Sequence, residues 1–232
     1  MSGDNMNIAE AEKIVRGRHW HHDFEIYPGV HTNGSYSPSF MIEKLDLPND
    51  LSGKTVLDIG ASDGFYSLEC ARRGARVTAV DYRHKSSSGF SAMETLNNVK
   101  IEHIQSNIYD IPDSIGKFDI VLCLGVIYHL PDIPKALWKL AGFCKGRLML
   151  ESYVESFDTD LPMARYYEAD SLRGDLTNFW APNFQCMQAM MRDCGFSILK
   201  TDGWGDRALV IGDIGATAGH KMTFAYTPKM NG

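Results

Sequence analysis

The chain has 232 residues and a formal net charge of −6, with 44% hydrophobic and 22% charged residues. This length suits a single domain over residues 1–232, and the acidic balance without a run of lysine or arginine argues against a nucleic-acid partner. Five cysteines without a C-x-x-C pair indicate reduced thiols, and no segment has the apolar length of a signal peptide or a membrane span, so we expect a cytoplasmic protein.

The first fifty residues are predicted to form a helical and lid-like segment. Residues 8–17 predict a first helix that ends at Gly17. Residues 18–32 are rich in histidine and aromatic side chains and show little helical period. A short helix is expected over residues 37–47, because a serine followed by a proline suits its N-cap and its first position.

Residues 54–65 contain the most informative pattern, a buried strand followed by a glycine turn and the start of a helix. Asp58 stands near the end of that strand, where a buried carboxylate needs hydrogen-bond donors from loop amides or from a ligand's ammonium group. The dinucleotide fingerprint fails, because Ser62 and Phe65 occupy its second and third glycine positions. The spacing D-x-G-x-x-x-G suits S-adenosylmethionine; the alternative is an ordinary α/β turn that contains two glycines.

Strands and helices alternate along the rest of the chain, as an α/β doubly wound sheet requires. The predicted strands cover 54–59, 75–80, 100–104, 118–124, 146–152 and 196–202, with a short strand at 207–211 and a last strand over 220–227. The predicted helices cover 64–73, 86–97, 132–144 and 183–194. Residues 153–181 lack a sustained period and carry many aromatic residues and arginines, which predicts a substrate-facing insertion.

Two further positions support a cofactor site. Asp81 ends the second predicted strand about 20 residues after the glycine turn, where an acidic residue holds ribose hydroxyls. Asn107 and Ile108 follow the third predicted strand, and in a parallel sheet that loop lies at the ligand edge, where both residues are expected to border an adenine.

Taken together, VLDIGASDG, Asp81 and FDIVLCLGVIYH resemble the class I S-adenosylmethionine-dependent methyltransferases over nearly all of the chain after residue 50. The resemblance implies a three-layer Rossmann-like fold with a seven-stranded, mostly parallel sheet whose last strand is antiparallel. It implies S-adenosylmethionine as cofactor and S-adenosylhomocysteine as product. The residues expected to bind the cofactor are Asp58, Gly60, Ala61, Ser62, Gly64, Asp81, Tyr82, Asn107, Ile108 and Leu124.

A narrower likeness is carried by GVIYHLPDIPKALWKL, LMLES, NFWAPN and the N-terminal Trp20-x-His22. These segments resemble the methyltransferase branch that contains the bacterial carboxymethyltransferase of the tRNA wobble uridine, and by that resemblance Tyr128 lines the transfer site. The tRNA enzyme has a long N-terminal extension and basic residues for a carboxylated cofactor. Residues 31–41 here contain no lysine or arginine, so we expect plain methyl transfer and no tRNA substrate.

Two histidines are candidates for a general base. His129 follows Tyr128 at the expected ligand edge, and an imidazole with a pKa of about 6.5 suits proton removal at neutral pH. The alternative for His129 is a cap on the turn that follows it. His22 is the rival base if its segment covers the cofactor, and otherwise a surface histidine. Tyr128 is expected either to hydrogen-bond the acceptor or to pack on the cofactor's methionine chain.

The insertion supplies the candidate substrate residues. Aromatic side chains there are expected to wall the substrate cavity, and arginines to pair with a substrate carboxylate. The candidates in the insertion are Arg165, Tyr166, Tyr167, Arg173, Phe179 and Trp180, and Tyr36 and Arg207 are further candidates outside it. A metal site is not expected, because the histidines near residue 20 lack zinc-type spacing.

The resulting hypothesis is a methyltransferase that acts on oxygen or nitrogen of a small molecule or a peptide end in specialised biosynthesis, as a monomer or a homodimer. A tRNA-modifying methyltransferase and a non-catalytic S-adenosylmethionine-binding module are the alternatives.

Overall fold

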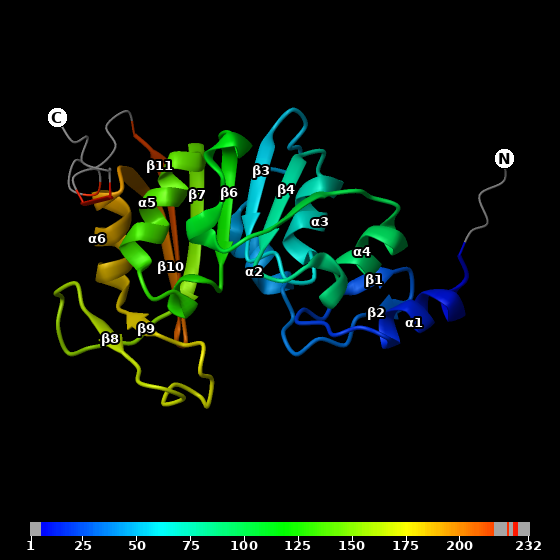
Figure 1. Ribbon diagram of the computed structural model, residues 1–232, viewed down its shortest axis with the longest axis horizontal. Coiled ribbons are helices and arrows are strands. Elements are labelled where there is room, and N and C mark those ends of the chain that lie inside the picture. The colour runs from blue at the N-terminus through cyan, green and yellow to red at the C-terminus, as the bar shows by residue number, and fades with distance from the viewer. Residues whose placement is uncertain (1–5, 216–221, 223–224, 227–232) are drawn as a thin grey trace. The chain divides into compact units, whose positions relative to one another are not determined.

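The computed structural model describes residues 6–215, 222, 225 and 226. Its Cα positions group into two compact units, with the boundary between Asn107 and Ile108. Figure 1 shows the course of the chain.

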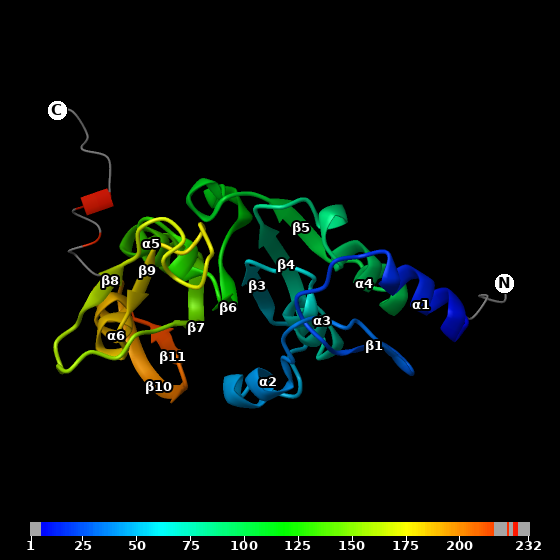
Figure 2. The ribbon, with the colours of Figure 1, turned by 90° about the horizontal axis from the view of Figure 1, so that it is seen from below.

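The first unit is built on three parallel strands in the order β3 (Thr55–Ile59), β4 (Arg76–Asp81) and β5 (Glu102–Gln105), which lie next to one another in Figure 2. Helix α3 (Phe65–Arg72) packs on β3 and β4. The strands β3 and β4 are buried almost throughout, which explains their continuous apolar composition.

The N-terminal segment begins with α1 (Ile8–Arg16), whose first turn carries a reciprocal capping box between Asn7 and Glu10. A small antiparallel pair follows, β1 (Glu25–Tyr27) with β2 (Val30–His31). The short helix α2 (Ser39–Leu45) starts after Pro38, so the prediction that Ser37 is its N-cap is wrong by one residue.

The predicted helix over 86–97 is only partly present. A 3-10 turn, η1 (Lys85–Ser87), is followed by α4 (Phe90–Asn97). The segment breaks at Ser88, whose backbone is extended (φ −127°, ψ −173°). Gly89 lies against the Trp20 ring, and a Cβ at that glycine would come within 2.3 Å of two ring atoms.

The second unit contains the parallel strands β6 (Phe118–Leu124) and β7 (Cys144–Tyr153). Strand β11 (Arg207–Ile214) pairs antiparallel with β7 on one side and with β10 (Phe196–Trp204) on the other. Helix α5 (Ile133–Phe143) packs on β6 and β7, and α6 (Phe184–Asp193), next to β10 in Figure 1, packs on β10 and β11.

The remaining elements of this unit are short. Three 3-10 turns are η2 (Ile108–Asp110), η3 (Asp113–Ile115) and η4 (Ile127–His129). The insertion predicted over 153–181 contains an antiparallel pair, β8 (Ala164–Tyr166) with β9 (Trp180–Pro182). This pair brings together the two ends of the long irregular loop between them.

The strand order is β10-β11-β7-β6-β3-β4-β5, which confirms the predicted seven-stranded α/β sheet with an antiparallel last strand. The position predicted for that last strand is wrong. It is β11, which extends the short strand expected at 207–211. Most of 220–227 falls outside the described residues, and the three that are described there, Met222, Ala225 and Tyr226, are helical.

Candidate active site

The turn after β3 is held by its own backbone. The amides of Gly60 and Ala61 both donate to the Val80 carbonyl, at 2.8 and 3.2 Å, and the Gly64 amide donates to the Ala61 carbonyl at 2.8 Å. Gly60, Ser62 and Gly64 have φ values of 73°, 52° and 87°. This left-handed backbone suits glycine and explains the two glycine positions of the D-x-G-x-x-x-G pattern as turn geometry.

Asp58 lies near the carboxyl end of β3 and is 3% exposed. Its Oδ2 accepts a hydrogen bond of 2.6 Å from the Ser67 hydroxyl on α3. Burial raises the pKa of Asp58 to about 6, against the opposing effects of the Ser67 bond and of the nearby His22. The carboxylate expected to need further donors is therefore buried, with one hydroxyl donor among the described residues.

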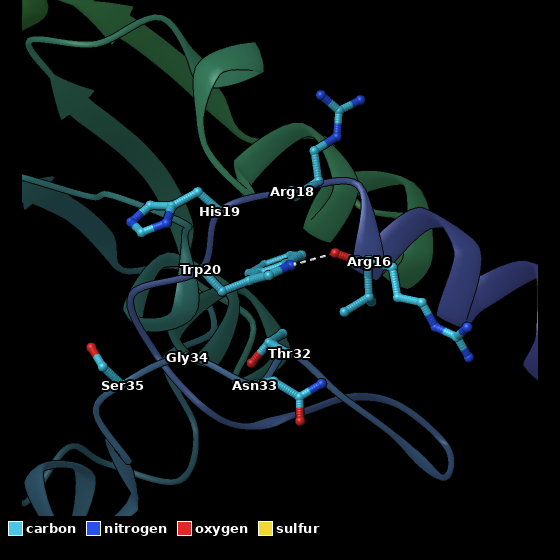
Figure 3. Close-up of a pocket in the computed structure, with 9 residues that line it drawn as sticks. Arg16, Arg18, His19, Trp20, Thr32, Asn33, Gly34 and Ser35 are labelled. Carbon is cyan, nitrogen blue, oxygen red and sulfur yellow. Dashed lines mark hydrogen bonds between the residues drawn. The ribbon is translucent and has the colours of Figure 1, made fainter.

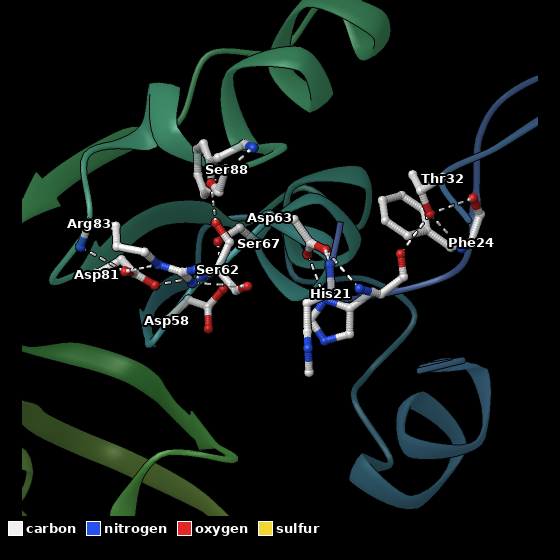
Figure 4. A network of polar contacts seen from close by, with 12 residues as sticks. His21, Phe24, Thr32, Asp58, Ser62, Asp63, Ser67, Asp81, Arg83 and Ser88 are labelled. Atoms are coloured by element: carbon white, nitrogen blue, oxygen red, sulfur yellow. Dashed lines mark hydrogen bonds and ion pairs between the residues drawn. The ribbon is translucent and has the colours of Figure 1, made fainter. Parts of the chain in front are cut away.

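Asp81 ends β4 and is tied to the same turn (Figure 4). Its Oδ2 accepts from the Ser62 amide at 2.9 Å, and its Oδ1 accepts from the Arg83 amide at 2.9 Å and from Arg83 Nε at 3.3 Å. A carboxylate has about four acceptor positions, so these three donors leave capacity for a ligand hydroxyl. Tyr82 beside it is 71% exposed.

Asp63, which no sequence pattern singled out, is fully buried in the glycine turn. Its Oδ2 accepts from the backbone amides of His21 at 2.9 Å and His22 at 2.8 Å, and its Oδ1 lies 2.6 Å from His22 Nδ1. Burial by itself raises the pKa of Asp63, but the His22 hydrogen bonds and charge outweigh it and lower the pKa below its usual value.

His22 is therefore not a surface histidine. It is 6% exposed, and its ring lies against the rings of Phe65 and Tyr66 on α3, with centroids 5.7 and 5.3 Å away. Its backbone forms a bridge with Tyr36, and its carbonyl accepts from the Thr32 hydroxyl at 2.6 Å. The N-terminal segment is thus fixed to the glycine turn after β3 through His22.

A hollow of about 450 Å³ is lined by residues of the N-terminal segment (Figure 3). Trp20 forms one wall, with its Nε1 donating to the Val15 carbonyl at 3.0 Å. Arg16, Arg18 and His19 surround it, but Arg16 is paired with Glu12.

In the second unit, Glu151 of β7 and Arg207 of β11 form a bidentate ion pair, with Nε–Oε1 and Nη2–Oε2 distances of 2.5 and 2.7 Å. Glu151 is 3% exposed. The Arg207 guanidinium also lies 5.1 Å from the centre of the Tyr128 ring. Desolvation alone would lower the pKa of Arg207, but its bonds to Glu151 raise that pKa above its usual value. The charge of Arg207 is thus already paired with Glu151, and a substrate carboxylate would have to compete with that partner.

His129 lies in η4 with its ring 4.1 Å from the ring centre of Tyr128. Its Nδ1 is 3.0 Å from the Thr177 hydroxyl oxygen, and that hydroxyl donates to Asp175 at 2.7 Å. Burial lowers the pKa of His129, while the contact with the Thr177 carbonyl opposes this. The ring is thus held by the insertion.

The insertion also holds most of the other substrate candidates. The Phe179 amide donates to the Tyr128 carbonyl at 2.8 Å, and Trp180 Nε1 donates to the Pro131 carbonyl at 3.1 Å. Tyr166 is 55% exposed and meets the Trp180 ring edge-on. The backbone of Phe179 is thus bonded to η4, and the ring of Trp180 is bonded to Pro131 shortly after η4.

The arginines of the insertion are already paired. Arg165 binds Glu155 at 3.1 Å, and Tyr167 donates to the same carboxylate at 2.7 Å. Arg173 is paired with Asp206. A substrate carboxylate would have to compete with these partners.

The remaining predicted residues differ in their burial. In the first unit Asn107 is exposed, and Tyr36 is half-buried. In the second unit Ile108 is buried, and Leu124 is half-buried at the end of β6.

Within the described part of the chain, no cluster of three or more histidine, cysteine, aspartate or glutamate side chains is arranged to hold a metal ion. No helix among the described residues is long and apolar enough to cross a membrane.

The chain matches the model of a methyltransferase domain family over residues 35–201. Among curated proteins it is 28% identical over 148 residues to the ubiquinone biosynthesis O-methyltransferase of Rickettsia bellii, which covers 63% of this chain and 61% of that protein. It is 30% identical to the protein of the same name from Rickettsia felis over 61% of this chain and 57% of that one. The chain therefore spans about three fifths of these relatives' length.

Solved structures share the fold at low identity. The N-terminal domain of EvdMO1, solved with S-adenosylhomocysteine bound, has a TM-score of 0.68 at 17% identity and covers 92% of this chain and all of that chain. The 1,6-didemethyltoxoflavin-N1-methyltransferase of Burkholderia thailandensis has a TM-score of 0.55 at 15% identity, with 70% and 72% coverage.

Proposed function

The chain belongs to the class I S-adenosylmethionine-dependent methyltransferases, and on this premise we propose that it transfers a methyl group to an oxygen or nitrogen atom of a small molecule or of a peptide end. The observation that carries the proposal is Asp58, a carboxylate buried at the end of β3 with a hydroxyl donor from Ser67 and a raised pKa. An ammonium group is the ligand chemistry that such a carboxylate lacks.

The chemistry of the turn supports S-adenosylmethionine as the ligand. Asp58 would accept from the amino group of the methionine part, and Asp81 retains acceptor capacity for ribose hydroxyls. Tyr82, exposed beside Asp81, would cover the adenine. The glycine turn offers no row of unpaired amides for a pyrophosphate, since the Gly60 and Ala61 amides are bonded to Val80.

The bound cofactor supplies an electrophilic methyl group on a sulfonium. The protein's task is then to align the acceptor and, for a hydroxyl or a protonated amine, to remove a proton. His22 and His129 are the two candidate imidazoles, each with Nδ1 engaged by a neighbour. The names of the relatives include both an O-methyltransferase and an N-methyltransferase, which supports either acceptor atom.

The proposal is tested with the full chain and S-adenosylmethionine labelled in its methyl group. The acceptor probes are a simple catechol acid (3,4-dihydroxybenzoate), a phenol, a primary amine and a short peptide with free ends. We expect label transfer to at least one probe and loss of transfer in Asp58→Ala. Asp50→Ala, which removes an exposed carboxylate, is the matched control and should retain transfer. Failure of the wild-type chain to bind S-adenosylhomocysteine would refute the proposal.

A further inference from the structure

The pairing of Asp63 with His22 is the feature of the first unit that the proposed function leaves unexplained. Asp63 stands inside the glycine turn, yet its three hydrogen-bond donors come from residues 21 and 22, far away in the sequence. A fully buried carboxylate with three donors is strongly held in the ionised form. The bond to the ring nitrogen Nδ1 of His22, at 2.6 Å, is the shortest of the three.

An ionised carboxylate can only accept hydrogen bonds, so the Asp63 contact requires a proton on His22 Nδ1. In the neutral ring the lone pair is then on Nε2. The ring itself is fixed by aromatic neighbours on α3 and by the bridge to Tyr36. The orientation and the tautomer of His22 are therefore both set by the fold.

We propose that Asp63 is a positioning residue that holds His22 with Nε2 as the proton acceptor in methyl transfer. This inference rests on the proposed function. In the step, the acceptor oxygen forms a bond to the methyl carbon, the carbon–sulfur bond breaks with its electron pair left on sulfur, and the hydroxyl proton moves to Nε2. The imidazolium formed lies against the Asp63 carboxylate and later gives its proton to solvent.

The surroundings of the two histidines favour His22 over His129. The Nδ1 of His22 has a buried carboxylate as its directly bonded partner. His129 instead contacts the neutral Thr177, whose hydroxyl donates to Asp175, and burial lowers the pKa of His129 against the opposing charge of Asp175. The neighbours of His22 that carry charge or titrate are Asp58, Asp63, His21, Tyr36 and Tyr66.

The first test reads the tautomer directly and needs no activity. Long-range proton–nitrogen NMR spectra of the full chain, labelled with ¹⁵N in histidine, show which ring nitrogen carries the proton, and His22→Gln identifies the signal. We expect Nδ1–H in the neutral wild-type ring. In Asp63→Asn the amide NH₂ can face Nδ1, which would move the proton to Nε2. A wild-type ring protonated on Nε2 would overturn the inference.

The second test measures transfer to the acceptor probe that the wild type accepts. His22→Gln and Asp63→Asn are expected to lower kcat by about 10²–10⁴, the usual range for a general base, with a much smaller change in KM for S-adenosylmethionine. The acidic limb of the pH–kcat profile should disappear in His22→Gln. His31→Gln, an exposed histidine of the same segment, should leave kcat unchanged.

The outcomes separate the two claims. If the wild type transfers no label to any probe, the proposed function fails and the base role fails with it. If the wild type is active, an unchanged pH profile in His22→Gln, or a loss of kcat in His129→Gln alone, overturns the inference and leaves the proposed function intact. A loss confined to cofactor affinity in Asp63→Asn would assign the pair a structural role and also overturn it.

Discussion

At the scale of single residues, three buried carboxylates lie in or beside the glycine turn after β3, and each has a different set of hydrogen-bond donors. Asp63 has three donors and Asp81 has three, whereas Asp58 has the Ser67 hydroxyl. Burial therefore raises the pKa of Asp58, while the His22 bonds lower that of Asp63. The residue whose donors are fewest is the one expected to meet the ligand's ammonium group.

This imbalance has a cost for the unliganded protein. The pKa of Asp58 is about 6 in the folded chain and near 3.8 when unfolded. The folded state therefore binds the proton more tightly, so the free energy of unfolding falls as pH rises from about 3.8 through about 6 and stays low above that. The difference amounts to about 3 kcal/mol at neutral pH.

Asp58→Asn should accordingly stabilise the unliganded protein while it weakens cofactor binding. We expect the free energy of unfolding to rise by about 1–3 kcal/mol above pH 6, or roughly 3–10 °C in Tm, with the gain shrinking as pH falls toward the unfolded pKa. Thermal unfolding across this pH range checks it. Asp50→Asn provides the control, since a Ser52 side-chain hydrogen bond lowers the pKa of exposed Asp50 and its removal should bring no gain. A Tm for Asp58→Asn below wild type at pH 8 would contradict the argument.

Asp58 and Asp81 could be predicted from the sequence, because each stands at the end of an apolar run that predicts a buried strand. Asp63 could not, because its donors lie 41 and 42 residues earlier in a segment without periodicity. The available signal was weak: a third acidic residue in a turn that should be buried, and a histidine-rich segment of unknown location.

At the scale of elements, α3 starts at a position that only glycine fills. Gly64 has a φ of 87°, and a Cβ there would come within 2.4 Å of Met93 Cε and 2.9 Å of Phe90 Cδ2 on α4. The close approach of α3's first turn to α4 therefore depends on the missing side chain.

Gly64→Ala should lower the free energy of unfolding by about 2–4 kcal/mol, from left-handed backbone strain together with overpacking. Gly53→Ala is the matched control, because Gly53 has a similar φ of 75° and an added Cβ there would meet no atom within 4 Å. Its free energy of unfolding should fall by about 1–2 kcal/mol, from backbone strain alone. Chemical denaturation of both variants measures the difference. Equal losses would show that contact with α4 contributes nothing.

Most elements followed from periodicity, but the last strand did not. Residues 220–227 alternate in polarity and therefore predict a half-exposed strand, whereas β11 contains a continuous apolar run, Ala208–Ile211, that is buried on both faces. The glycines on either side of this run are typical of a loop. This segment is a strand because it pairs antiparallel with β7, and that long-range interaction is not visible in the local sequence pattern.

At the scale of the whole molecule, ligand binding should be visible as added stability. A ligand at 100 times its Kd adds about 2.7 kcal/mol, which corresponds to roughly 5–10 °C in Tm for a chain of this size. We expect S-adenosylhomocysteine to produce such a rise in the wild type and a much smaller one in Asp58→Asn.

The matched ligand is 5′-methylthioadenosine, which shares the nucleoside and thioether but lacks the amino acid. Its shift should be the same in the wild type and in Asp58→Asn if Asp58 serves the ammonium group. If the variant loses both shifts equally, Asp58 acts on the fold of the site and not on the amino acid.

The Asp63 pairing also bears on where this domain begins. The methyltransferase family model matches from residue 35, yet the donors of Asp63 are residues 21 and 22, and the Trp20 ring covers Gly89. A fragment trimmed to the matched range would keep a fully buried carboxylate and remove these three donors to it, a change that costs several kcal/mol. The range matched by the family model is therefore shorter than the stretch of chain that must fold together.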